Sequence, residues 1–209
     1  MIIAVDGPTA SGKGTIARAL AAHFGLPVLD TGLLYRAVGY QTQLNHGDPD
    51  NAADALAACD FPDSLLGDPA LRFESTGSLA SRASVHPAVR AALLQRQVDF
   101  ANQPGGAVLD GRDIGTVIAP HADAKLFVTA SPEERARRRH AEMAARGVEV
   151  SFDAVLADVH ARDARDTGRA DAPLLRAEGA MLLDNSDMDR EAAIAAAIAF
   201  VEQRRKDRA

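Results

Sequence analysis

The 209-residue sequence has a single cysteine, no long apolar run and no excess of positive charge. Because Cys59 is alone, an intrachain disulfide is excluded, and nothing indicates an oxidising compartment. The longest apolar run, residues 192–201, is too short to cross a bilayer and is flanked by charged residues. The first residues lack the basic segment of a signal peptide. We therefore expect a cytoplasmic protein without a membrane partner.

The sequence also lacks the features typical of zinc-binding and nucleic-acid-binding proteins. The six histidines are scattered, with no pair at metal-ligand spacing, which argues against a structural zinc site. The net charge of −6 argues against general nucleic-acid binding. Hydrophobic residues make up 47% of the chain, which is enough for one α/β core with a minor insert. We expect a single domain over residues 1–209 and, because no element demands a dimer, a monomer.

A glycine-rich segment near the N-terminus carries a specific chemical signal. It follows an apolar, β-branched run (residues 1–5) that predicts a buried strand, and it precedes a helical stripe formed by Ile16, Leu20 and Phe24. Its glycines permit the turns with which backbone N–H groups converge on an anion at a helix N-terminus. We predict that it binds the phosphates of ATP. Its residues are Gly7, Pro8, Thr9, Ala10, Ser11, Gly12, Lys13, Gly14 and Thr15.

This segment approaches the pattern G-x-x-x-x-G-K-S/T but departs from it at one position. Gly14 stands where the pattern has Ser or Thr, and the hydroxyl comes one residue later at Thr15. Lys13 is expected to reach the β- and γ-phosphates. Mg²⁺ is expected to be held mainly by phosphates and water, without a protein ligand cluster. The alternative, a glycine-rich turn that happens to contain a lysine, does not account for the flanking strand and helix.

Further along, predicted strands alternate with helices, which indicates a mostly parallel sheet covered on both faces. We predict a three-layer α/β fold of the P-loop kind with a five-stranded sheet. The strands after the first are expected at residues 27–30, 108–110, 124–130 and 181–183. Helices are expected from residue 13, at residues 31–44 and 131–147, from residue 151, and at residues 189–206.

Residues 45–86 interrupt the alternation. They are rich in Asp, Gly, Pro and Ala, and carry a possible helix at residues 51–58 and a possible strand at residues 71–73. Inserts on α/β folds commonly form the mouth of a binding site, although a plain surface excursion would have a similar composition. Both interpretations stay open at this point.

Arginine dominates the cations, with 20 residues against three lysines. Arg162, Arg165 and Arg169 recur on one helical face, and Asp158 and Asp166 are each four residues from Arg162. This spacing is typical of a salt-bridge ladder, but arginine also clamps phosphate oxygens and stabilises charge in phosphoryl transfer. The nearby phosphate loop favours the second role. Solvent exposure is the competing interpretation for Arg135, Arg137, Arg138 and Arg139.

A carboxylate ends the strand predicted at residues 108–110. Open α/β sheets bind ligands at the carboxyl ends of their strands, so Asp110 is well placed to hold the water shell of Mg²⁺. An aspartate at the end of a strand also commonly serves a turn or a helix cap. The sequence alone leaves both roles open for Asp110.

Five segments together resemble the bacterial cytidylate kinases, which are P-loop nucleoside monophosphate kinases. Their order and spacing are similar from residue 2 to about residue 185. The string Asp-Gly-Arg-Asp-Ile-Gly-Thr is far more specific than the phosphate loop, which many kinases share. The segments are residues 7–15, 29–36, 80–81, 110–116 and 162–166.

This resemblance implies ATP-dependent phosphorylation of CMP and dCMP by in-line transfer with Mg²⁺. The kinase would have three parts: a core (residues 1–44 and 87–209), a monophosphate-binding insert (about residues 45–86) and a short lid (about residues 140–160). The family usually has a longer insert that contains a small antiparallel sheet, whereas this sequence offers one possible strand there. The insert of this sequence is therefore expected to differ in architecture from the usual one.

The resemblance also implies roles for individual residues. Arg36, Arg112 and Arg169 would hold the acceptor phosphate. The full acceptor set would be Thr31, Arg36, Ser81, Arg90, Arg112, Asp113, Arg162, Asp166 and Arg169. The residues acting on the transferring group would be Lys13, Asp110, Arg112, Arg162 and Arg165.

The base and the ribose would be held by the other members of the acceptor set. Ser81, Arg90 and Asp113 would read the cytosine edge, and Arg162 and Asp166 would hold the ribose. Cytosine has an exocyclic amine that the carboxylate of Asp113 accepts, and ring acceptors that Arg90 satisfies. Uracil would instead turn a carbonyl oxygen toward the carboxylate. We therefore expect selection for cytosine.

Three alternative functions are compatible with a phosphate loop. Adenylate, uridylate, shikimate or gluconate kinases would share the phosphate loop but not the string at residues 110–116. A GTPase-type switch would need an Asn-Lys-x-Asp string, which the sequence lacks. A non-catalytic nucleotide sensor remains open, and acceptor-dependent turnover distinguishes it from a kinase.

Overall fold

The computed structural model describes residues 1–207, and its centre is a parallel sheet. Within these residues five strands pair in the order β2-β3-β1-β4-β5, and the pairings are parallel. The predicted α/β class and sheet are therefore confirmed. The strands are β1 (Ile2–Asp6), β2 (Val28–Asp30), β3 (Ala107–Gly111), β4 (Ala124–Thr129) and β5 (Met181–Asp184).

The two central strands bring the candidate site together. β1 lies between β3 and β4, and its residues Ile3, Ala4 and Val5 are fully buried because helices cover both faces of the sheet. The ends of β1 and β3 are in register, with Asp6 opposite Gly111. The phosphate loop after β1 and the segment after β3 consequently emerge side by side at one edge of the sheet.

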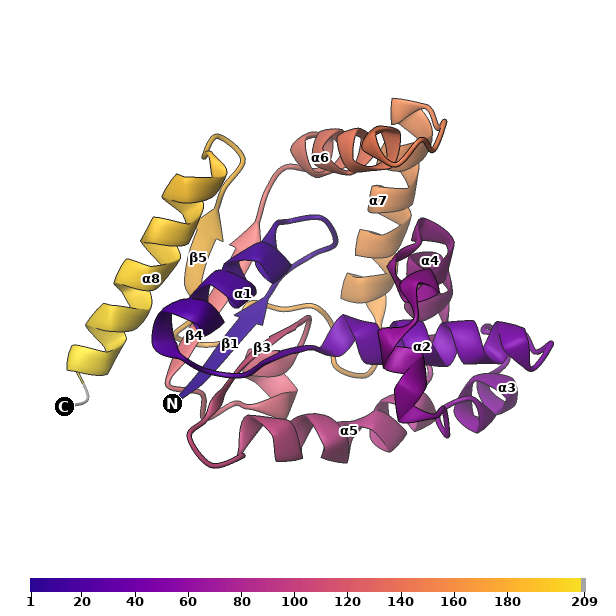
Figure 1. Cartoon of the computed structure of the whole chain (residues 1–209), viewed down its shortest axis with the longest axis horizontal. Coiled ribbons are helices and arrows are strands. Elements are labelled where there is room, and N and C mark those ends of the chain that lie inside the picture. The colour runs from indigo at the N-terminus through magenta and orange to yellow at the C-terminus, as the bar shows by residue number, and fades with distance from the viewer. Residues whose placement is uncertain (208–209) are drawn as a thin grey trace.

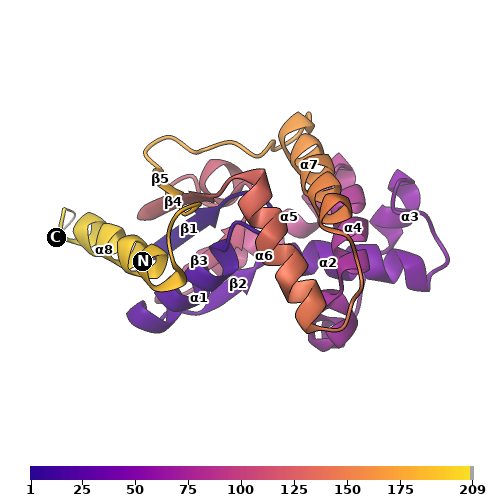
Figure 2. The same ribbon diagram turned by 90° about the horizontal axis from the view of Figure 1, so that it is seen from above.

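Helices cover the sheet and extend beyond it. On one face, α1 and α8 pack Leu20 and Val201 against Ile3 of β1, and on the other Ile114 packs against Leu109 of β3. Figures 1 and 2 show α2, α3 and α4 gathered at the end of the molecule away from α8. The helices are α1 (Lys13–Phe24), α2 (Thr31–Leu44), α3 (Ala52–Ala57), α4 (Glu74–Ala83), α5 (Pro87–Ala101), α6 (Pro132–Ala145), α7 (Phe152–Gly168) and α8 (Arg190–Lys206).

The insert is helical, so the strand predicted at residues 71–73 is wrong. Residues 69–72 form a 3₁₀ helix that begins at a proline, and the carboxylate of Asp68 accepts the Ala70 N–H at 2.7 Å. The N-cap and the proline that follows it favour a helical turn over a strand. The helix expected at residues 51–58 is confirmed as α3, capped by Asn51. Within residues 1–207 the insert contains no strand, and so no antiparallel sheet.

The insert also shares a core with its flanking helices. Leu71 from the insert packs in one buried cluster with Leu34 and Val38 of α2 and with Val89 and Leu93 of α5. This cluster makes α2, α4 and α5 one packed unit, and α5 was not among the predicted helices. The insert is therefore built into the fold and does not lie loosely on its surface.

Helices α6 and α7 form an antiparallel pair beside the carboxyl edge of the sheet (Figure 2). The helices predicted at residues 131–147 and from residue 151 are confirmed, and Ser131 and Ser151 cap them by accepting a backbone N–H with their hydroxyl oxygens. The two helices share a small apolar cluster formed by Ala136, Val155 and Val159. No helix among residues 1–207 combines the length and the apolarity that a membrane span requires.

Candidate active site

The phosphate loop is shaped by two glycines that other residues could not replace. At Gly7 a Cβ atom would lie 2.0 Å from the carbonyl oxygen of Val128. Gly12 has a φ of 85°, which glycine adopts without strain. Directly after Gly12, α1 begins at Lys13 and points its first unpaired N–H groups toward the loop. The loop is therefore preformed for an anion.

Most of the predicted loop residues line a donor cleft above α1. The other three, Gly7, Pro8 and Ser11, do not line this cleft, and two of them hold the loop in shape through their carbonyl groups. The carbonyl of Pro8 accepts from Lys13 Nζ at 3.3 Å, and the carbonyl of Ser11 accepts from the Asn185 side-chain amide at 2.9 Å. The loop residues that line the donor cleft are Thr9, Ala10, Gly12, Lys13, Gly14 and Thr15.

Lys13 and Asp110 face each other across the floor of the donor cleft. Lys13 Nζ lies 3.9 Å from Asp110 Oδ1. Burial and the nearby Arg112 lower the pKa of Lys13 to about 8, and burial raises the pKa of Asp110 to about 6. Both charged forms are thus poorly solvated in the free protein. A bound polyphosphate would favour the charged form of Lys13 because it supplies the missing opposite charge.

The structure explains why glycine replaces the usual hydroxyl residue at position 14. A Cβ atom on Gly14 would lie 2.9 Å from Asp110 Oδ2, closer than ordinary contact. The carboxylate of Asp110 therefore occupies the space that a serine or threonine side chain would need. This packing supports the expected absence of a hydroxyl ligand at position 14.

The acceptor residues predicted from the family resemblance lie around one cleft next to the donor cleft. They come from six places along the chain: α2, α4, α5, the segment after β3, α7, and the residue that follows α7. The structure thus brings every predicted acceptor residue together, and their individual roles stay predictions. The lining residues that were predicted are Thr31, Arg36, Ser81, Arg90, Arg112, Asp113, Arg162, Asp166 and Arg169.

One end of the acceptor cleft carries a buried ion pair. The guanidinium of Arg90 donates to the carboxylate of Asp113, and both side chains are more than nine-tenths buried. Burial raises the pKa of Asp113, although Arg90 and Arg169 oppose that shift. The guanidinium also lies over the ring of Tyr35, 5.6 Å from its centroid. This end therefore offers fixed donors and acceptors against a flat aromatic wall.

The other end of the acceptor cleft concentrates positive charge. Burial and the neighbouring Arg162 lower the pKa of Arg36 to about 10, and burial lowers the pKa of Arg162 and of Arg169. Arg112 donates to Asp166 at 2.7 Å. Burial acts against the charged form of Arg112, but Asp166 outweighs it and raises the pKa. A bound phosphate would stabilise this group of cations.

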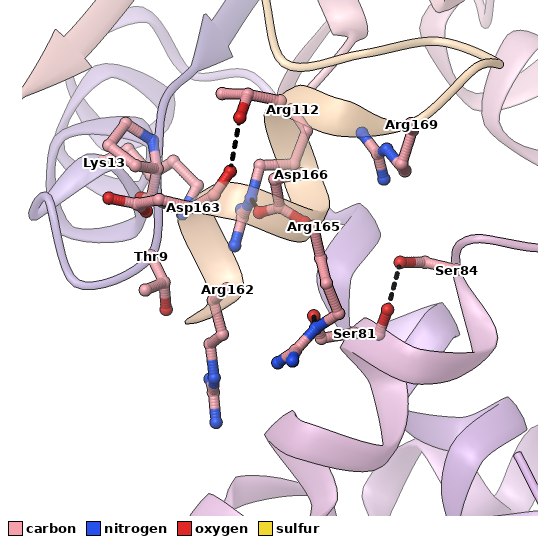
Figure 3. Close-up of polar contacts among 12 residues, drawn as sticks. Thr9, Lys13, Ser81, Ser84, Arg112, Arg162, Asp163, Arg165, Asp166 and Arg169 are labelled. Atoms are coloured by element: carbon pink, nitrogen blue, oxygen red, sulfur yellow. Dashed lines mark hydrogen bonds and ion pairs between the residues drawn. The ribbon is translucent and has the colours of Figure 1, made fainter. Parts of the chain in front are cut away.

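Helix α7 lines the acceptor cleft with Arg162 and Asp166, and Arg165 lies on the same side (Figure 3). Its Nε donates to the hydroxyl oxygen of Ser81 on α4 at 2.9 Å. The predicted action of Arg165 on the transferring phosphoryl group stays a prediction. Arg162 pairs with Asp158 at 2.8 Å, as the ladder predicts, whereas Asp166 pairs with Arg112.

The four arginines of α6 divide between the interior and the surface. Arg135 is buried and donates to Thr9, Ala130 and Asp163, so it ties α6 and α7 to the phosphate loop. Arg138 donates to the side chain and carbonyl of Asn185, and both Arg138 and Arg139 line the donor cleft. Arg137 has a 67% exposed side chain. The solvent-exposed interpretation is therefore right for Arg137 and wrong for Arg135.

Sequence reasoning missed several residues of the two clefts. Tyr35 and Gly77 line the acceptor cleft, and a Cβ atom on Gly77 would lie 2.9 Å from Arg36 and 3.0 Å from Arg162. A glycine inside a helix is a local signal of such close approach, so Gly77 could have been found. Asn185 carries no comparable signal, because its contact with Ser11 crosses most of the chain.

A metal ion would find few protein ligands here. Within the described part of the chain, no group of three or more His, Cys, Asp or Glu residues is arranged to hold one. Asp110 Oδ1 is buried without a hydrogen-bond partner among the described residues and lies on the floor of the donor cleft. Such an oxygen fits the water shell of a nucleotide-bound Mg²⁺.

Comparisons with known proteins agree with this geometry. The family model described as cytidylate kinase matches residues 3–203. A solved structure of an uncharacterized protein from Eubacterium ventriosum has a TM-score of 0.56 at 14% identity, covers 97% of this chain and 98% of its own, and supports the fold alone. The cytidylate kinase of Xanthobacter autotrophicus is 57% identical, with 100% of both chains covered, and that of Methylobacterium sp. is 58% identical, with 98% of both covered. The chain therefore belongs to the cytidylate kinase family.

Proposed function

We propose that the protein transfers the γ-phosphoryl group of ATP to CMP and dCMP, which yields ADP with CDP or dCDP. The observation that carries this proposal is the junction of the two clefts. Both clefts are lined by Thr9, Gly32, Arg36 and Arg112. Two nucleotides bound in these clefts would therefore meet phosphate to phosphate, which is the arrangement that direct transfer between them requires.

The donor nucleotide would bind with its phosphates in the loop and its base toward α8. Lys13 and the first N–H groups of α1 would hold the β- and γ-phosphates. Bound Mg²⁺ would neutralise charge on these phosphates, and the carboxylate of Asp110 would hold its water shell. Arg138, which lines the donor cleft, would add positive charge from α6.

The acceptor would lie with its phosphate among Arg36, Arg112 and Arg169. In-line attack by an acceptor phosphate oxygen needs no covalent catalyst, so these side chains act by positioning and by charge. Arg162 on α7 would stabilise the transferring group, because it lines the acceptor cleft near Arg36, a residue that both clefts share. Asp166 orients Arg112 through their 2.7 Å contact.

The base would lie against Arg90 and Asp113. Cytosine would satisfy the carboxylate with its amine and the guanidinium with its ring acceptors. Uracil would leave buried groups unpaired, at a cost of about 1–3 kcal/mol for each group. The same pair disfavours the adenylate and uridylate kinase alternatives.

Acceptor-dependent turnover tests the function directly. ADP formed from ATP and Mg²⁺ should increase strongly when CMP or dCMP is added, less with UMP, and least with AMP. Arg36→Ala should abolish most of this increase, whereas the matched change Arg137→Ala on the exposed face of α6 should not. ADP formation that does not change when CMP is added would support the alternative of a non-catalytic nucleotide sensor. Equal turnover of CMP and UMP would overturn the assigned base specificity. We further infer that the protein is cytoplasmic and monomeric. Gel filtration with light scattering would check the monomeric state.

A further inference from the structure

A buried carboxylate outside both clefts contacts the segment that carries the base-reading residue. Asp6, the last residue of β1, is 3% exposed and lines neither cleft. Its Oδ1 accepts the Ile114 N–H and its Oδ2 accepts the Gly115 N–H, both at 2.8 Å. These two N–H groups follow directly after Asp113. Asp6 therefore joins the strand that enters the phosphate loop to the segment that reads the acceptor base.

The peptide between Asp113 and Ile114 is held on both sides. Its N–H donates to Asp6, and its carbonyl accepts from Val117 at 2.8 Å and from Ile118 at 3.2 Å. The two bonds to the carbonyl open a π-helical turn, a rare geometry that is frequently found at functional sites. The backbone directly after Asp113 is therefore fixed by hydrogen bonds on both sides. A shift of this backbone would move Asp113 relative to Arg90, so the geometry of the ion pair depends on both sets of bonds.

The ionised form of Asp6 is disfavoured by its buried position. Burial raises its pKa to about 7, against the two backbone hydrogen bonds that lower it, and Asp113 and Asp110 raise it further. What the carboxylate provides is two acceptor atoms in a fixed plane, which hold two consecutive N–H groups at once.

We infer that Asp6 is a positioning residue for acceptor-base selection, because its carboxylate fixes the backbone that aims Asp113 at the base. The inference rests on the proposed function and concerns the same cleft. Asp6 touches neither nucleotide in this arrangement. Its contribution passes through the backbone of residues 113–115 alone.

Asp6→Asn tests the inference with little change in volume. The amide keeps one acceptor and turns a donor toward the second N–H, so one of the two bonds is lost. We expect kcat/KM for CMP to fall about tenfold or more and the ratio of CMP to UMP to fall with it, since small misplacements of positioning groups are costly. KM for ATP and the slow ATP hydrolysis without acceptor should stay within about twofold of wild type.

Asp123→Asn is the matched control. Asp123 also accepts a backbone N–H of β1, that of Ile2 at 2.7 Å, but at the opposite end of the strand from the site. Its substitution should leave the ratio of CMP to UMP unchanged even if it lowers thermal stability. A ratio that falls equally in both variants would overturn the inference, because the effect would then be loss of general stability. An unchanged ratio in folded Asp6→Asn would overturn it as well.

Gly115→Ala perturbs the same contact from the other side. A Cβ atom there would lie 3.1 Å from the Cβ atom of Ala177 and 3.3 Å from Asp6 Oδ2, so it crowds the carboxylate as well as Ala177. The ratio of CMP to UMP should fall, and the double variant should lose less than the product of the two single losses. If Asp6→Asn does not fold, the ratio in Gly115→Ala decides alone. Wild-type protein that shows no CMP-dependent turnover would refute the proposed function, a result distinct from an unchanged ratio.

Discussion

Substitution of Gly14 by serine would restore the common phosphate-loop pattern, and we expect it to lower activity. The reason is the position of Asp110. A Cβ atom on Gly14 would lie 2.9 Å from Asp110 Oδ2, and Asp110 has a side chain only 7% exposed. The new side chain must therefore displace the carboxylate from its place opposite Lys13.

Two opposing effects set the magnitude of this change. Replacement of a glycine inside helix α1 favours the helix by up to about 1 kcal/mol. Overpacking in a filled site costs about 1–3 kcal/mol. The collision therefore outweighs the helix propensity, and the free energy of unfolding should fall by up to about 2 kcal/mol. Displacement of Asp110 should lower kcat/KM for ATP about tenfold or more, since misplaced charged groups act on the transfer step itself.

The assay is steady-state kinetics at several Mg²⁺ concentrations together with urea unfolding. Gly14→Ala is the matched variant, because it adds the same Cβ atom without a hydroxyl. Equal losses in both variants would show that the collision is the cause. If Gly14→Ser matched or exceeded wild-type kcat/KM, the space beside Asp110 would have to accept a hydroxyl, and the argument from packing would be refuted.

Four further predictions follow from the site. Lys13→Ala should lower turnover about a hundredfold or more while the protein stays folded, because a charge contact in the transition state is worth several kcal/mol; near-native turnover would remove Lys13 from the phosphate site. Asp113→Asn should narrow the difference in kcat/KM between CMP and UMP, measured side by side, and an unchanged difference would assign base selection elsewhere. Hydrogen exchange across residues 135–169 should slow when CMP and an ATP analogue bind together, since phosphate supplies the free energy for closure over these arginines; unchanged protection would mean a static surface. The pKa of Asp6 is about 7 in the folded protein against an ordinary 3.8, so its contribution to stability is present below pH 3.8 and is lost as the pH rises to about 7; unfolding free energies should decline less steeply over this range in Asp6→Asn, and an identical slope would contradict the burial argument.

Local features of the chain were predictable because they depend on near neighbours. The helix at residues 31–44 has the predicted bounds, and Ser131, Ser151 and Asp189 each cap a predicted helix. A side-chain oxygen that accepts the unpaired backbone N–H three residues later favours the start of a helix, and this contact depends only on near neighbours in the chain. The phosphate loop likewise depends on one short segment between a strand and a helix.

The acceptor residues were predictable through motifs that match a family, but their arrangement was not. Helical spacing pairs Asp158 with Arg162 correctly, yet it offers Asp166 the same partner. In the fold Asp166 pairs instead with Arg112, which is 54 residues away, because the segment after β3 and helix α7 both line the acceptor cleft. Sequence spacing does not encode which of two neighbouring elements lies closer.

Tertiary structure alone decided the features that depend on contacts across the sheet. Nothing near Gly14 in the chain indicates that a carboxylate from β3 fills the space beside it. Nothing near Asp6 indicates that its side chain accepts hydrogen bonds from residues 108 and 109 positions away. These contacts arise because neighbouring strands in a parallel sheet end together, so that residues far apart in the chain share one small volume. The sequence by itself therefore determined the strands of the sheet, the helices other than α4 and α5, and the chemistry of the site, and packing determined which groups meet there.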